Sequence, residues 1–170
     1  MTQTRELYFP DREITDKNEI RFILENAAIC RLGFAEKGIP YVIPFNYGFT
    51  YENDIITLFF HCAPGGRKLD IIKDNPLVCF ETDYIHNIDP DENPDRNSKI
   101  FESIVGTGKI QEVTELKEKV SMLEKIIEVF AKYNPVYKPK PLTEERVAGA
   151  KIRMLKLVLD EYKAKRIFHL

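Results

Sequence analysis

The segment 60–76, FHCAPGGRKLDIIKDNP, brings together residue types that can bind an anion. A β-rich run ends at His61, a turn with two glycines follows, and Arg67 and Lys68 open a helical pattern. The first turn of a helix carries unpaired N–H groups and the positive end of the helix dipole, and glycine lets a phosphate approach the backbone closely. An arginine can bind two phosphate oxygens, and a lysine adds a point charge. Taken alone, GGRK is more often a glycine turn before a solvated helix face, so the phosphate hypothesis depends on its neighbours.

The residues around this segment form no catalytic motif that would act without a cofactor. His61 ends its strand close to any anion held at the turn, although a hydrogen-bonded structural histidine is the default interpretation. For Cys62, a packing role is more typical than a catalytic one. Glu81 and Asp83 alternate along a strand, and neither a nucleophile elbow nor an HExxH motif is present. We therefore expect any chemistry to depend on a bound cofactor.

The composition excludes several other classes of protein. The 170 residues suffice for one domain with a core, and the net charge of -2 comes without a basic block, which argues against nucleic-acid binding. The N-terminus lacks the apolar core of a signal peptide, and no apolar run approaches the roughly 20 residues that span a bilayer. We expect a cytoplasmic protein without a membrane segment. Its three cysteines are widely spaced without a CxxC pair, which indicates reduced thiols and no metal site.

The first half of the chain predicts a helix followed by a hairpin. Thr15 or Asp16 can cap the helix, and two strand-like runs then flank a tight turn at 36–38. The second run alternates between a bulky apolar set and a small set; these are Tyr41, Ile43, Phe45, Tyr47 and Phe49, and Val42, Pro44, Asn46 and Gly48. We expect the bulky set to face the core, Pro44 to lie at an edge or bulge, and Gly48 to allow the close approach of another group.

The rest of the chain predicts strands joined by turns. The expected strands cover 55–61, 77–83, 98–113 and 150–168, and the expected helices cover 66–74, 114–133 with Thr114 as its cap, and 143–147. Residues 84–97 are expected to form a mobile acidic loop, and residues 134–141 a stiff linker. Gly106 and Gly108 predict a kink or bulge in their strand.

About six strands in hairpin-like succession exclude a doubly wound sheet, in which strands and helices alternate throughout. We predict a mainly β protein, with a single domain over residues 1–170. Its core is expected to be a six-stranded antiparallel Greek-key β-barrel with two to four flanking helices.

Three stretches, taken in order, resemble a known family. ENAAICRLGFAEKGIPYVIPFNYGF, FFHCAPGGRKLDIIKDNPLVCFETD and FESIVGTGKIQEV are similar to the pyridoxamine 5′-phosphate oxidase-like flavin-binding proteins, and more narrowly to their nitroimidazole-resistance (Nim-type) branch. The resemblance covers roughly residues 19–112. It implies a split β-barrel that forms a homodimer, with FMN bound in clefts at the dimer interface.

The resemblance also implies which residues form the flavin site. Gly66, Arg67 and Lys68 match the positions at the flavin phosphate. The strand along the ring edge is matched by Ile43, Pro44, Phe45 and Asn46. The segment beside the ring and the ribityl chain is matched by His61, Cys62 and Ala63, and the long-strand positions that complete the pocket are matched by Ser103 and Val105. APGG departs from the small or polar residues that relatives often carry there.

The implied function is that of an FMN-dependent oxidoreductase whose small-molecule electron acceptor is a nitroaromatic compound such as a nitroimidazole. His61 is the candidate for proton delivery near the ring. The substrate-binding pattern of true pyridoxamine phosphate oxidases is not visible in DEYKAKRIFHL, so that reaction is not predicted. Three alternatives remain open: a flavin carrier using FMN or FAD, a haem-binding relative with His61 or else His86 as axial ligand, and a barrel without a cofactor.

Overall fold

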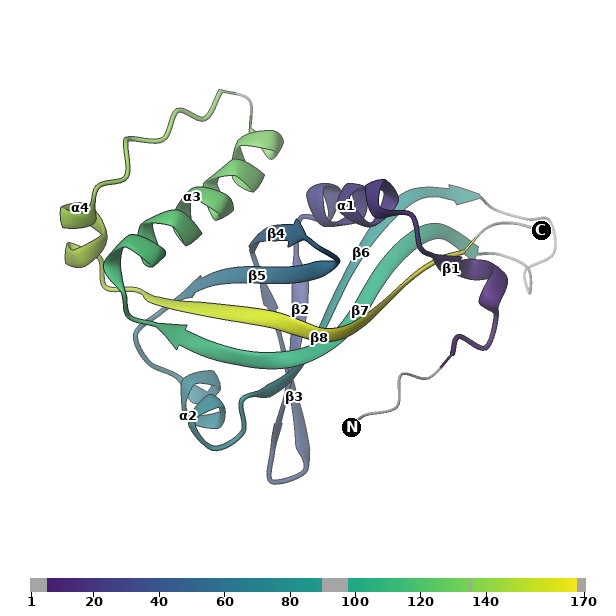
Figure 1. Ribbon diagram of the computed structural model, residues 1–170, viewed down its shortest axis with the longest axis horizontal. Coiled ribbons are helices and arrows are strands. Elements are labelled where there is room, and N and C mark those ends of the chain that lie inside the picture. The colour runs from purple at the N-terminus through teal and green to yellow at the C-terminus, as the bar shows by residue number, and fades with distance from the viewer. Residues whose placement is uncertain (1–5, 90–97, 135, 168–170) are drawn as a thin grey trace.

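The computed structural model describes residues 6–89, 98–134 and 136–167 (Figure 1). In chain order the elements are η1 (Pro10–Arg12), β1 (Glu13–Ile14), α1 (Lys17–Asn26), β2 (Cys30–Glu36), β3 (Ile39–Phe45), β4 (Gly48–Glu52), β5 (Ile55–Cys62), α2 (Arg67–Asp74), β6 (Leu77–Asp89), β7 (Ser98–Val113), α3 (Leu116–Tyr133), α4 (Glu144–Gly149) and β8 (Arg153–Ile167). The mainly β, antiparallel fold class is thus confirmed, with helices flanking the sheet.

The strands form one antiparallel sheet in the order β3-β2-β6-β7-β8-β5-β4, and β1 pairs with β8. The two end strands, β3 and β4, are consecutive in the chain and are separated only by Asn46 and Tyr47. Because neighbouring Cα atoms lie about 3.8 Å apart, this short link forces the ends of the sheet together. The rings of Phe45 and Phe60 meet across the junction, with centroids 5.3 Å apart. The sheet is therefore a barrel whose hydrogen-bonded order is interrupted between β3 and β4.

The expected count of six strands is wrong, because the described residues form eight. β1 adds a two-residue strand, and the single run expected after the first hairpin turn is divided at Asn46–Tyr47, where the chain leaves β2 and begins to pair with β5. Strand β6 also extends to Asp89, so residues 84–89 are not part of a loop. The segment pairs with the long strand β7 as far as Asp89, and it contains Tyr84 and Ile85, which are residue types that favour strands. Residues 90–97 of the expected loop lie outside the described residues.

Helix α1 follows the sequence pattern. The carboxylate of Asp16 caps it by accepting hydrogen bonds from the N–H groups of Asn18 and Glu19, at 2.9 and 3.0 Å. Its apolar side faces the barrel, where Ile23 and Leu24 are fully buried. Local capping and apolar periodicity therefore suffice to place this helix.

Helix α3 begins one residue later than expected, because Glu115 is its cap in place of Thr114. The Glu115 carboxylate accepts hydrogen bonds from the N–H groups of Lys117 and Glu118. The helix packs against the outer surface of the sheet, where a second apolar cluster is made of Phe59, Val113, Met122, Ile126 and Met154. In Figure 1 α3 and α4 lie together at one end of the molecule, and α1 lies on the other side of β4.

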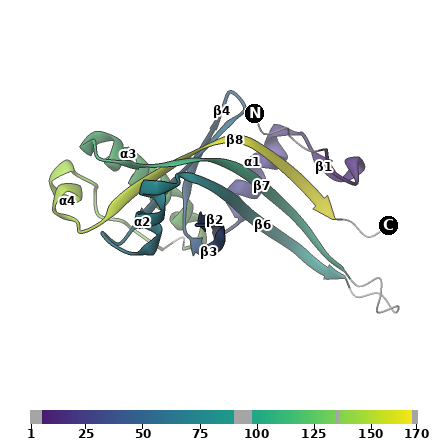
Figure 2. The ribbon, with the colours of Figure 1, turned by 90° about the horizontal axis from the view of Figure 1, so that it is seen from below.

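Glycines lie at an irregularity of β7 and at a close contact of β4, as the sequence predicts. The register of β7 against β8 shifts between Thr107 and Gly108, which confirms the expected irregularity. The paired ends of β6 and β7 extend beyond α1 towards one end of the molecule (Figure 2). Gly48 faces the backbone of α3, so the group that approaches it belongs to the protein itself.

Gly48→Ala tests this contact. A methyl group at Gly48 would lie 2.5 Å from the backbone nitrogen of Ile126, a distance that forces α3 away from the barrel. We expect the free energy of unfolding, measured by urea denaturation, to fall by about 1–3 kcal/mol.

Gly149→Ala is the matched control, because a methyl group there would meet no atom within 4 Å. Its free energy of unfolding should change by less than about 0.5 kcal/mol. Equal stabilities of the two variants would show that α3 does not need the glycine.

Candidate functional site

Three of the four predicted groups of site residues meet where the barrel is interrupted. The end of β3 carries Ile43–Asn46, and the Phe45–Phe60 ring contact brings it against the end of β5, which carries His61 and Cys62. Ala63 follows on the way to α2. The guanidinium of Arg67, in the first turn of α2, lies 4.5 Å from the centre of the Tyr41 ring on β3. These three segments therefore surround one junction.

The start of α2 retains the features of an anion site. Gly66 is the N-cap with a φ of 118°, a conformation that favours glycine, and no side chain caps the helix. The first N–H groups of an α-helix have no acceptor within the helix. The backbone at Gly66–Lys68 therefore presents free donors and the positive end of the helix dipole.

Lys68 is the cation best placed to act with these donors. Its Nζ atom lies 3.8 Å from the position that a Cβ atom on Gly66 would occupy, so the side chain folds back over the turn. None of the ion pairs within the described residues involves Lys68. Burial raises the pKa of the Cys62 thiol, and the ammonium of Lys68 opposes part of that rise.

Arg67 differs from Lys68 because it already has an anionic partner. Its guanidinium binds the Glu36 carboxylate, with Nη2 at 2.9 Å and Nε at 3.1 Å from Oε2. Both side chains are about half exposed, and such surface pairs contribute little to stability. A guanidinium has five N–H donors, so the pair with Glu36 leaves donors for a second anion. In this structure Arg67 joins α2 to the β2–β3 hairpin.

His61 has an unsatisfied polar atom. Its Nδ1 is buried without a hydrogen-bond partner among the described residues. The residue lies on the outer side of β5, opposite Met154 of β8. Burial lowers the pKa of His61, which favours the neutral imidazole. The other predicted haem ligand, His86, is engaged: its Nε2 lies 3.0 Å from Glu102, and its ring stacks on Phe22.

The fourth predicted group lies elsewhere on the same sheet. Val105 is separated from Pro44 by β2 and β6, through the pairs Pro44–Arg31, Arg31–Glu81 and Glu81–Val105. At a strand spacing of about 4.8 Å, the separation is about 14 Å. Ser103 is buried on the same strand, whereas Val105 is exposed. A single chain therefore does not bring Ser103 and Val105 to the junction.

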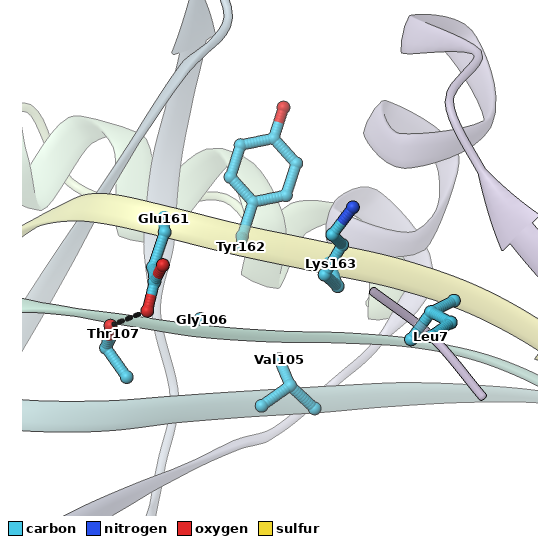
Figure 3. Close-up of a pocket in the computed structure, with 7 residues that line it drawn as sticks. All are labelled: Leu7, Val105, Gly106, Thr107, Glu161, Tyr162 and Lys163. Atoms are coloured by element: carbon cyan, nitrogen blue, oxygen red, sulfur yellow. Dashed lines mark hydrogen bonds between the residues drawn. The ribbon is translucent and has the colours of Figure 1, made fainter. Parts of the chain in front are cut away.

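Val105 borders a different pocket, shown in Figure 3. This pocket has a volume of about 270 Å³ and is lined by residues of β7 and β8 together with Leu7. The hydroxyl of Thr107 donates to the Glu161 carboxylate at 3.2 Å along its wall. The pocket lies on the long strands and does not include the start of α2.

Sequence reasoning missed a cavity of about 360 Å³ between α2 and the ends of β7 and β8. Pro64, Gly65 and Gly66 form its rim, and Glu112 and Arg153 reach it from β7 and β8. These two residues pair with each other, at 2.6 Å between Oε1 and Nη1. No local pattern predicts them as neighbours of the glycine turn, because they lie far from it in the chain.

The sequence predicts neither a metal site nor a membrane-spanning segment. Within them, no group of three His, Cys, Asp or Glu side chains is arranged to hold a metal ion, and the three cysteines are free. The described helices include none with the length and apolar character to cross a membrane.

His61 predicts a pH dependence of stability. Because burial lowers its pKa below the usual 6.5, the unfolded chain binds a proton that the folded protein does not. The free energy of unfolding should therefore fall as the pH drops below about 6.5, towards the lowered pKa, and this contribution should be constant above that range. His61→Phe removes the titrating group. The difference in the free energy of unfolding between wild type and variant should therefore narrow or reverse on acidification. Urea denaturation between about pH 5 and 8 measures this difference, and parallel curves for the two proteins would contradict the prediction.

Comparison with known proteins places this arrangement in a family. A family model described as pyridoxamine 5′-phosphate oxidase matches residues 16–166, whereas no curated protein sequence gives a match. The structure is similar to that of a protein from Bacteroides thetaiotaomicron assigned as a candidate 5-nitroimidazole antibiotic resistance protein, with 26% identity, a TM-score of 0.71, and coverage of 91% of this chain and 86% of that one.

Two more distant structures share the fold. The flavocytochrome Anf3 from Azotobacter vinelandii is 15% identical, with a TM-score of 0.74 and coverage of 99% of this chain and 75% of that one. A FAD- and haem-binding protein from Mycobacterium smegmatis is 15% identical, with a TM-score of 0.72 and coverage of 91% and 73%. Because the family model extends from the cap of α1 almost to the end of β8, the chain belongs to the pyridoxamine 5′-phosphate oxidase family.

Proposed function

We propose that the protein binds a flavin nucleotide where β3, β5 and α2 meet, and that it is a flavin-dependent reductase of small molecules. One observation carries the proposal: the uncapped start of α2 at Gly66, with the ammonium of Lys68 folded over it, lies at the junction of the barrel. Family membership supports it, because the junction corresponds to the segments whose sequences resemble flavin-binding proteins.

The residues at the junction fit a flavin in three ways. The N–H groups at Gly66–Lys68 and the Lys68 ammonium can hold the phosphate. Strand β3 is an end strand of the sheet order, so its outer edge leaves backbone groups for the polar edge of the ring. The buried Nδ1 of His61 lacks a partner that a ligand can supply.

A bound flavin supplies the hydride or electron transfer, and the protein binds, orients and tunes it. Lys68 neutralises the charge of the phosphate and anchors that end of the cofactor. A neutral imidazole at His61 carries one N–H donor and one acceptor nitrogen, so it can donate a proton to a neighbouring group or accept one from it. The small-molecule acceptor is a nitroaromatic compound, as in the nitroimidazole-resistance branch that the sequence resembles.

The proposal includes a homodimer. On the outer side of the sheet, α3 covers β5 and the adjoining ends of β7 and β8, and exposed apolar side chains remain on the other strands. Val42 on β3 is 61% exposed, and Val105 on β7 is 42% exposed. A second copy of the chain seated on this surface would cover both residues. It would also bring Ser103 and Val105 towards the junction of its partner, which a single chain does not do.

Val105→Arg tests the dimer. A buried, unpaired guanidinium is costly, so we expect the variant to be monomeric in light scattering and to bind FMN weakly, although its own Lys68 is intact. Val136→Arg is the control, because Val136 is 82% exposed in the segment after α3 and the change should leave both properties unaltered. A Val105→Arg protein that remains dimeric would reject this interface.

Lys68→Ala tests the flavin site. Loss of one charge-assisted contact to a phosphate should weaken FMN binding by about tenfold or more, as followed by quenching of flavin fluorescence. Lys138→Ala removes an exposed lysine from the linker after α3 and should bind FMN like the wild type. Equal affinities of the two variants would show that Lys68 is not a phosphate ligand.

The same variants test the activity. Wild-type protein with reduced flavin should convert the nitro group of a nitroimidazole, and Lys68→Ala should do so more slowly at limiting flavin. Unchanged nitroimidazole would reject this acceptor class. A titration with haemin tests the haem alternative, in which a Soret band would form and be lost in His61→Ala while flavin binding persists.

A further inference from the structure

The cavity beside α2 has no role in the flavin site described above. It is enclosed by the α2 face that carries Leu69 and Ile72 and by the ends of β7 and β8, and its volume is about 360 Å³. Small-molecule pockets measure roughly 300–1,000 Å³, so the cavity can hold one small aromatic group. Its rim is the turn Pro64–Gly66, which is also the rim of the proposed phosphate site.

Cys62 connects the cavity with the flavin site. It is directly opposite Arg153 in the β5–β8 ladder, and Arg153 lines the cavity. Burial raises the pKa of the Cys62 thiol, the charges of Lys68 and Arg153 oppose that rise, and the charge of Glu112 adds to it. The phosphate site and the cavity therefore both adjoin one short stretch, from the end of β5 to the start of α2.

The lining combines apolar walls with charges that cancel. Leu69, Ile72 and Leu155 supply aliphatic surface, whereas Asp70 and Glu112 oppose Lys73 and Arg153. Each carboxylate is paired, Asp70 with Lys73 at 2.9 Å and Glu112 with Arg153 at 2.6 Å. A lining without net charge suits a neutral ligand that has both a flat apolar ring and several hydrogen-bonding groups.

Adenosine has this chemistry. Its purine can pack between aliphatic side chains and the planar guanidinium of Arg153, and its ribose hydroxyls can donate to carboxylates such as Glu112. Its position also follows from covalent structure, because in FAD the adenosine is joined to the flavin phosphate through a second phosphate. The path between the two sites crosses Gly65, where a Cβ atom would meet no atom within 4 Å.

We propose that the flavin nucleotide is FAD, and that its adenosine half occupies the cavity bounded by Pro64–Gly66, Ile72, Glu112 and Arg153. This inference rests on the proposed flavin site and extends it. The phosphate next to the riboflavin binds at Gly66 and Lys68, the second phosphate passes over Gly65, and the adenosine enters between α2 and the barrel. FMN lacks the group that fills the cavity.

The experiment compares the dissociation constants of FAD and FMN for the full chain by titration calorimetry. Wild-type protein should bind FAD about tenfold or more tightly than FMN. Arg153→Ala removes the guanidinium wall, and Ile72→Trp fills the cavity. Both should bring the affinity for FAD close to that for FMN, while the affinity for FMN changes by less than about twofold.

Lys151→Ala is the matched control, because Lys151 is an exposed cation two residues before Arg153 and does not line the cavity. It should retain the preference for FAD. Because Arg153 is half exposed, we expect Arg153→Ala to fold. That variant therefore decides the outcome even if Ile72→Trp does not fold.

Two results would overturn the inference while leaving the flavin site intact: equal affinities of the wild type for FAD and FMN, or an equal loss of both in Arg153→Ala. Absence of binding of either flavin to the wild type would instead reject the proposed function, and this inference with it.

Discussion

The two-residue link between β3 and β4 is the constraint on which the rest of the structure depends. Asn46 and Tyr47 join the first and last strands of the sheet order, so the sheet must curl until its ends meet. The interruption that remains is where β3, β5 and α2 come together. An open sheet with the same strands would leave the end of β3 and the start of α2 far apart. The barrel and the candidate site are thus consequences of one connection.

The start of α2 makes this junction a candidate anion-binding site through electrostatics. A glycine with positive φ replaces a capping side chain, so the backbone donors of the first turn stay available, and Lys68 adds a charge without an acidic partner among the described residues. Arg67, one position earlier, forms a salt bridge with Glu36 and packs over the Tyr41 ring. Adjacent basic residues therefore take different roles, because successive positions on a helix face different neighbours.

The helices divide the outer surface of the sheet. Close contact between Gly48 and the backbone of α3 lets that helix cover one part of the barrel, and the exposed valines on β3 and β7 remain outside its reach. Helix α2 covers an end of the barrel incompletely, which leaves the cavity that Glu112 and Arg153 line. Which surfaces stay uncovered is therefore decided by helix placement, and the proposed partner and nucleotide occupy those surfaces.

The sequence by itself determined the features that depend on neighbouring residues. The cap at Asp16, the hairpin turn before Ile39, the glycine start of α2 and the bulge near Gly108 all follow from local backbone preferences. Most of the proposed site residues came instead from the resemblance of sequence motifs to a known family. Only the tertiary structure decided the break at Asn46–Tyr47, the pairing of Arg67 with Glu36, the distance of Val105 from the junction, and the place of Arg153 beside the glycine turn. Each of these features either involves residues that are distant in the chain or depends on how the strands pair. Local propensity carries no information about such partners until the barrel closes.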